Sequence, residues 1–153
     1  MTRRSMVLCL LSLCAGFQVA CRQALAWRLI MEEEALAESK VPPPEAAAPL
    51  PNTGAPQIEV IAPDASKPIR TPVSILIKFH AQAGATIDPK TFRAKYGWLG
   101  IDITDRIVGH AKIDASGLAA DDAEVSPGQY MVRLEIADNL GRIGTRSINF
   151  KVV

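Results

Sequence analysis

Residues 126–153 alternate between apolar and polar side chains in two runs that a short polar loop separates. The loop, at residues 138–141, has the composition of a hairpin turn. A period of two with one apolar face is typical of a strand that packs on a core with one side and meets water with the other. The apolar positions are Tyr130, Val132, Leu134 and Ile136, then Ile148, Phe150 and Val152. This region therefore predicts two antiparallel strands of a half-exposed sheet.

Similar short segments precede this hairpin, and turn residues separate them. The clearest has apolar residues at Val73, Ile75, Ile77 and Phe79, and we expect it to be a central strand. Short strands without a helical period between them predict an all-β fold, an antiparallel β-sandwich of about seven strands. The segments cover residues 58–60, 73–81, 91–98, 101–107, 111–114 and 118–125.

The start of the penultimate strand carries a recognisable motif. In Ser126-Pro127-Gly128-Gln129, proline presets φ at the second position and glycine tolerates positive φ at the third, which predicts a type II turn. With Tyr130 behind it, this segment resembles the tyrosine corner of immunoglobulin-like domains. The resemblance implies structural roles for Pro127, Gly128 and Tyr130, with the tyrosine hydroxyl bonded to backbone between Asp122 and Ser126.

The same resemblance extends over residues 57–153. The last hairpin, residues 135–142, is similar to the last hairpin of bacterial immunoglobulin-like repeats in surface and periplasmic proteins. Such domains mostly serve as spacers, adhesive modules or accessory domains of envelope assemblies. The resemblance therefore implies a fold and a cellular setting, but it assigns no chemistry.

The N-terminal residues have the pattern of a secretory signal peptide. After a basic start, residues 6–20 are apolar and uncharged, and Ala24 and Ala26 supply the small residues of a cleavage site. The apolar run is shorter than the roughly 20 residues that a helix needs to span a bilayer. We expect residues 1–26 to be the signal peptide. An uncleaved anchor, or lipid attachment at Cys21, is the alternative, and either would tie the domain to a membrane.

Cleavage at this site would leave a mature chain without cysteine. All three cysteines, Cys9, Cys14 and Cys21, lie in the leader. Export normally permits disulfides, so we expect the domain to be stabilised by packing alone.

The composition changes twice between the leader and the first strand. Residues 27–40 have helix-forming composition, and residues 41–56 are rich in Pro and Ala. A Pro/Ala-rich segment favours extended conformations and buries no core, so it predicts a semi-rigid spacer. We therefore assign residues 27–56 to a short helical segment and linker, and residues 57–153 to the sandwich. Trp27 begins the part expected to be unstructured, where it is a candidate for docking onto a partner.

The charge of the mature chain excludes a nucleic-acid partner. Three of the 17 Lys and Arg residues lie in the leader, which has no acidic residue, so the remaining 14 face 16 Asp and Glu and give a net charge of −2. Nucleic-acid binding requires a basic surface that neutralises phosphates. The basic cluster of Arg93 and Lys95 is offset by nearby acids.

A second resemblance concerns metal binding. Residues 85–89, Ala-Thr-Ile-Asp-Pro, follow a long strand as in small copper-carrying β-sandwich proteins of the periplasm. Those proteins bind copper through histidines, one of them at the mature N-terminus. Here the expected N-terminus is Trp27, and His80 and His110 are the two histidines of the chain. Since a metal site needs further ligands and supporting hydrogen bonds, we expect surface histidines, no metal site and no cofactor.

Three residues are candidates for contact with a ligand or partner. Trp98 shares strand parity with Phe92 and Tyr96, so it lies either in the core or on the surface as an aromatic platform for a sugar or peptide. Asp138 and Asn139 lie in the hairpin loop, where a carboxylate and loop carbonyls would suit calcium. Aspartates at strand ends also cap turns.

No arrangement of residues predicts catalysis. The mature chain has no cysteine, no G-x-S-x-G turn and no histidine near a serine in a recognisable context. We therefore expect a non-catalytic domain, periplasmic or secreted, that contacts another envelope protein or acts as an accessory structural module. The alternative is a small-ligand module that binds carbohydrate or a metal ion through strand-end loops.

Overall fold

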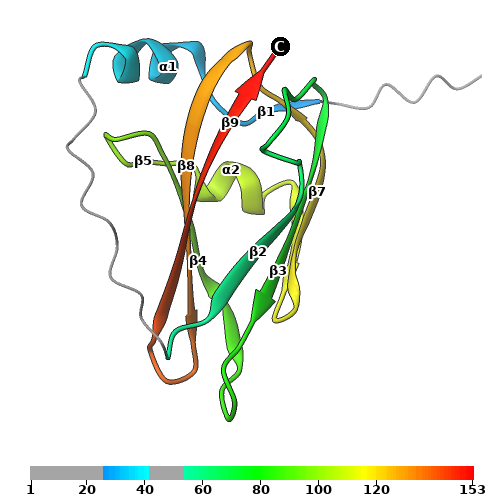
Figure 1. Cartoon of the computed structure of the whole chain (residues 1–153), viewed down its shortest axis with the longest axis vertical. Helices are drawn as coiled ribbons and strands as arrows, with labels where there is room; N and C mark the ends of the chain where they lie inside the picture. Colours follow the sequence, from blue (N-terminus) through cyan, green and yellow to red (C-terminus); the bar gives the residue numbers. More distant parts are fainter. Residues whose placement is uncertain (1–25, 42–53) are drawn as a thin grey trace, which may run out of the picture.

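The structure, a computed structural model, describes residues 26–41 and 54–153 as two β-sheets packed face to face (Figure 1). One sheet contains β1 (Trp27–Arg28), β2 (Gln57–Ala62), β3 (Val73–His80), β6 (Ala111–Asp114) and β7 (Gly117–Glu124). The other contains β4 (Ile87–Tyr96), β5 (Ile101–Asp102), β8 (Gly128–Asp138) and β9 (Ile143–Val152). The helices are α1 (Glu32–Ser39) and α2 (Thr104–Val108). The three cysteines of the predicted leader, and residues 42–53 of the predicted linker, lie outside the described residues.

The strand order places β2 and β9 at neighbouring edges of the two sheets. The first sheet has the order β1-β7-β3-β2, with β6 on the same side of β7 as β1, and the second has the order β5-β4-β8-β9. Every pairing between these strands is antiparallel except the short one between β1 and β7. At the opposite side of the sandwich, α2 contacts β4 and β6, and Figure 1 shows it between the two sheets. The β-sandwich class predicted from the sequence is confirmed, and β3 is an interior strand.

The core comes from the inward positions of the alternating strands. Phe92, Leu118, Leu134 and Ile136 are almost completely buried, and the rings of Phe79 and Phe92 bridge the sheets with centroids 6.1 Å apart. The polar residues between them lie on the outer faces, as a period of two requires. Neither helix in the described ranges is long and apolar enough to cross a membrane.

Residues 101–107 do not form the predicted strand. Only Ile101 and Asp102 pair with β4, and α2 follows. Ile103 and Ile107 are both buried because a spacing of four places them on one face of a helical turn. Alternation over so short a segment also fits a helix, so the interpretation as a strand was wrong.

Tyr130 lies as the tyrosine corner implies, but the turn before it differs from the prediction. The Tyr130 ring is buried, and its hydroxyl donates a hydrogen bond to the Ser126 carbonyl at 2.8 Å. Gly128 is not among the described residues with positive φ and begins β8, so the type II turn is wrong. Instead, a Cβ at Gly128 would lie 3.1 Å from the Tyr130 hydroxyl, so the missing side chain makes room for the ring.

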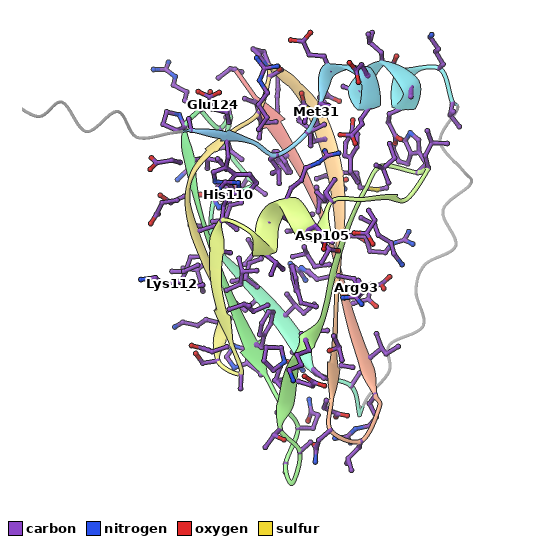
Figure 2. The ribbon with its side chains drawn as sticks, turned by 180° about the vertical axis from the view of Figure 1, so that it is seen from behind. Met31, Arg93, Asp105, His110, Lys112 and Glu124 are labelled. Carbon is purple, nitrogen blue, oxygen red and sulfur yellow. The ribbon has the colours of Figure 1, made fainter. Side chains whose placement is uncertain are left out.

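The core also includes residues that precede Gln57. Trp27, Leu29 and Ile30 are buried, and β1 pairs with the end of β7. The Trp27 indole N–H donates to the Asp121 carbonyl at 2.9 Å, and its ring stacks on His110 with centroids 4.7 Å apart. Figure 2 labels His110 at this end of the molecule. The indole proposed for docking onto a partner is thus packed within its own chain.

Candidate functional site

Trp98 is exposed because the chain turns out of β4 immediately before it. Phe92 and Tyr96 are 1% and 2% exposed, whereas Trp98 is 38% exposed. Gly97 and Gly100 both have positive φ, of 66° and 65°, a region that glycine enters without steric cost. Gly97 ends the alternation of β4, and its N–H donates to the Met131 carbonyl at 2.9 Å. Of the two positions considered for Trp98, the structure therefore places it on the surface.

Helix α1 holds this turn through a buried carboxylate. Glu38 is 8% exposed, and its Oε1 accepts the Trp98 backbone N–H at 2.6 Å. Its Oε2 has no hydrogen-bond partner among the described residues. A Cβ at Gly97 would lie 2.1 to 2.3 Å from the carboxylate atoms, so this close approach requires glycine. The contact joins residues 60 positions apart in the sequence.

Charge interactions fix α1 in turn to α2. The Arg106 guanidinium donates two hydrogen bonds of 2.6 Å to the Glu34 carboxylate, which also accepts the Met31 N–H at 2.9 Å. The hydrogen bond from Arg106 lowers the pKa of Glu34 despite its partial burial. Bidentate pairs of this kind are geometrically specific. The orientation of Glu38 therefore depends on a helix that is attached at both ends.

The buried carboxylate of Glu38 also acts on Tyr96, the ring below this turn. Burial raises the pKa of Tyr96 to about 12, and the carboxylate of Glu38 adds to the shift. Tyr96 is thus a neutral, buried ring below the turn.

A shallow hollow lies beside the exposed indole, on the outer face of the second sheet. Its volume is about 340 Å³. We call it the Trp98 hollow; it is lined by Ala65, Trp98, Gln129, Tyr130, Met131, Asn149, Phe150 and Lys151. The indole and Met131 offer apolar contact, while two side-chain amides and one ammonium group offer hydrogen bonds. This combination suits a partner or ligand that is partly apolar and partly polar.

Asp138 and Asn139 are engaged within the chain. The Asp138 carboxylate accepts the N–H groups of Leu140 and Arg142 at 2.9 and 3.0 Å and the Arg142 Nε–H at 2.7 Å. Burial raises the pKa of Asp138, but these hydrogen bonds outweigh burial and lower it overall. Asn139 accepts the Thr86 N–H with its side chain at 2.8 Å and donates its own N–H to the Thr86 carbonyl at 2.9 Å. Both residues therefore shape the hairpin and the neighbouring loop.

The two histidines lie in different parts of the first sheet. His80 ends β3 and contacts the Glu59 carboxylate at 2.9 Å, while His110 precedes β6 and stacks on Trp27. In residues 26–41 and 54–153, no group of three or more His, Cys, Asp or Glu side chains could hold a metal ion.

Comparisons with known proteins give a weak structural match. No protein-family model and no curated protein matches the sequence. The fold is similar to that of CopC from Methylosinus trichosporium OB3b, with 17% sequence identity, a TM-score of 0.39, and coverage of 62% of this chain and 92% of that chain. A similarity of this size carries no argument about function.

Sequence reasoning named Trp98 as a candidate contact and left its exposure open, and it missed the residues that position the indole. The glycines that flank the Trp98-Leu99 pair were a usable sign, because two glycines so close together often mark left-handed turns. Glu38 gave no such sign, because it lies in an acidic segment among several similar residues.

Proposed function

We propose that this chain is a non-catalytic, exported module that contacts another protein of the cell envelope through the Trp98 hollow. The observation that carries the proposal is an exposed tryptophan whose backbone is fixed by the buried carboxylate of Glu38. A rigid exposed indole loses little conformational freedom on binding, and tryptophan is enriched among the residues that dominate protein interfaces.

The surroundings of the indole fit a protein contact. Leu99 is exposed beside it, and Met131 extends the apolar surface. Gln129, Asn149 and Lys151 surround this apolar centre with polar groups. An apolar centre with a polar rim is the usual anatomy of a protein interface.

A glycan is the second candidate, and the side-chain amides favour it. Gln129 and Asn149 can bind sugar hydroxyls while the indole packs on a pyranose ring, and neither contact needs a metal ion. The metal-binding alternative has no comparable group of ligands within the described ranges.

The test is site-specific crosslinking in an envelope extract of the source organism. We expect the wild-type chain and Leu140→Ala to give the same crosslinked partner and Trp98→Ala to lose it. Leu140 is the matched control, because it is an exposed apolar residue in the hairpin at the far end of the sandwich. Equal crosslinking by all three would contradict the proposal. Trp98-dependent fluorescence quenching by purified envelope glycans, without a protein partner, would support the glycan candidate instead.

A further inference from the structure

Within the described residues, strand β9 has a backbone edge that is paired only near its C-terminal end. On one side it pairs with β8 over its whole length. On the other side, Ile69 donates to the Lys151 carbonyl at 2.8 Å and accepts the Val153 N–H at 2.9 Å. Alternate residues of a strand direct their N–H and C=O groups to the same side. The backbone groups of Thr145, Ser147 and Asn149 therefore point away from β8, as the carbonyl of Lys151 does. They have no backbone partner among the described residues.

This edge borders a groove that opens toward the interior of the sandwich. Residues 60–61 and 63–66 form one wall, and residues 146–149 of β9 form the other. We call this the β9 groove. Ala65 and Asn149 line both this groove and the Trp98 hollow, so the two are continuous.

An apolar cavity lies behind the groove, between the two sheets. Its volume is about 50 Å³ and its lining is entirely apolar. Val60, Pro63 and Ile148 line both the groove and the cavity, so an occupant of the groove can reach it. A dry cavity of about 150 Å³ admits benzene, so this smaller one suits a short branched side chain.

Unpaired cationic side chains gather along β9 and form a cationic border beside the groove. Arg146 lines the groove itself, together with the acidic Asp64. Four exposed cationic residues lie along β9 or beside it, and none of them forms an ion pair within the described ranges: Arg70, Arg133, Arg146 and Lys151. The nearby carboxylates of Asp64 and Glu135 are already paired, with Lys67 and Lys95. An acidic occupant is therefore complementary to this edge.

The charges also argue against a second copy of this chain as the occupant. Arg146 lies opposite the buried Leu134 in the β8–β9 register, so it has inward parity at the mouth of the groove. Inward-pointing charges on edge strands disfavour edge-to-edge association between identical chains. Two copies paired through β9 would also bring two cationic borders together.

We propose that β9 binds an acidic, extended peptide segment of another protein, which adds to the sheet as a further strand. Its backbone bonds to the groups of Thr145, Ser147 and Asn149, one branched apolar side chain enters the cavity, and flanking carboxylates meet the cationic border. Strand addition of this kind derives affinity from main-chain hydrogen bonds and specificity from side-chain pockets. The inference rests on the proposed function. It names the kind of segment with which a partner bound at the Trp98 hollow also contacts the neighbouring β9 edge.

The probe is a set of synthetic nine-residue peptides selected from a fully randomised library against the mature protein. We expect the selected peptides to share a Val, Ile or Leu flanked by Asp or Glu. Binding should shift the backbone amide signals of residues 145, 147 and 149 and slow their hydrogen exchange. An N-methylated twin with the same side chains should bind at least tenfold more weakly, because it cannot complete the strand pairing.

Two variants test the edge itself. Ser147→Pro removes an outward N–H while leaving the bonds to β8, and proline is tolerated at such edge positions. Arg146→Glu reverses an exposed charge, with Lys112→Glu on the β6 edge as its matched control (Figure 2). We expect tenfold weaker binding for Ser147→Pro and Arg146→Glu, and unchanged binding for Lys112→Glu, with circular dichroism confirming that each variant folds.

The outcomes separate this inference from the proposed function. Peptide binding that is lost in Trp98→Ala but kept in Ser147→Pro and Arg146→Glu overturns strand addition and leaves the Trp98 hollow as the contact. Binding that persists in all variants overturns strand addition, and the crosslinking of Trp98→Ala then decides the proposed function separately. A library that yields no acidic peptide, or peptides whose N-methylated twins bind equally well, overturns the inference alone.

Discussion

Tyr130 stabilises β8 through the packing of its ring and through the hydrogen bond of its hydroxyl. Two substitutions measure these interactions separately. Its ring packs on Tyr96 and Phe150, with centroid distances of 5.8 and 5.6 Å, and covers Gly128. Its hydroxyl donates to the Ser126 carbonyl at 2.8 Å. Tyr130→Phe removes the hydrogen bond alone, and Tyr130→Ala removes the ring as well.

The two steps differ in expected size. Loss of one neutral hydrogen bond reduces the free energy of unfolding by about 1 kcal/mol. Ser126 is exposed, so water can replace the hydroxyl as a partner for its carbonyl, which keeps this loss small. Tyr130 is 6% exposed, so truncation to alanine leaves a cavity among aromatic rings. Such truncations cost about 3 to 5 kcal/mol, a large part of the roughly 5 to 15 kcal/mol that stabilises a typical domain.

The assay is equilibrium unfolding in urea followed by far-UV circular dichroism, with Gln129→Ala as the control. Gln129 is the exposed neighbour of Tyr130 on β8, and its truncation should leave the midpoint nearly unchanged. If both Tyr130 variants unfold like the wild type, the ring is not part of the core and the register of β8 is wrong. If the phenylalanine variant is as unstable as the alanine variant, the hydroxyl rather than the ring dominates, which contradicts the packing argument.

Three further predictions concern the attachment of the N-terminal segment. Gly97→Ala should destabilise the fold by about 1 to 2 kcal/mol, because alanine is strained in a left-handed backbone conformation. It should also clash with the Glu38 carboxylate, and Glu38→Ala in the same chain should relieve that clash. A double-mutant cycle of urea midpoints measures the steric contribution. Arg106→Gln should cost about 1.5 to 3 kcal/mol at neutral pH. Because the pKa of Glu34 is lowered in the folded state, that contribution is present above the unfolded pKa of 4.5 and is lost as the pH falls through the folded pKa, so wild type and variant should converge in acid melts. The fragment 57–153 should have a lower urea midpoint than the chain that begins at Trp27. It lacks the three large buried apolar side chains Trp27, Leu29 and Ile30, worth about 1.5 to 3 kcal/mol each. Equal midpoints would show that the N-terminal segment does not stabilise the sandwich.

The candidate site shows how far local patterns reach. The alternation of β4 put Trp98 at an inward parity, and the same sequence contained the glycine that ends this parity. The turn at Gly97 takes the indole to the surface, and Glu38 of α1 holds that turn. No local pattern encodes where α1 packs. Asp138 illustrates the converse case, because a loop carboxylate that suits calcium also suits the N–H groups of its own turn. The structure places it with Leu140 and Arg142.

The sequence by itself determined the two-sheet sandwich, because the period of two and the turn residues act between near neighbours and commit each strand to one buried face. The tyrosine-corner resemblance also implied a backbone partner for the Tyr130 hydroxyl between Asp122 and Ser126, and the partner is the Ser126 carbonyl. Tertiary structure alone decided the helical form of α2 and the burial of Trp27, whose indole bonds to a carbonyl 94 positions later. It also decided the position of Glu38 beneath the Trp98 turn, 60 positions away. Contacts across such separations depend on which surfaces remain uncovered once the sheets have formed, and that property belongs to the assembled sandwich rather than to any segment of the chain.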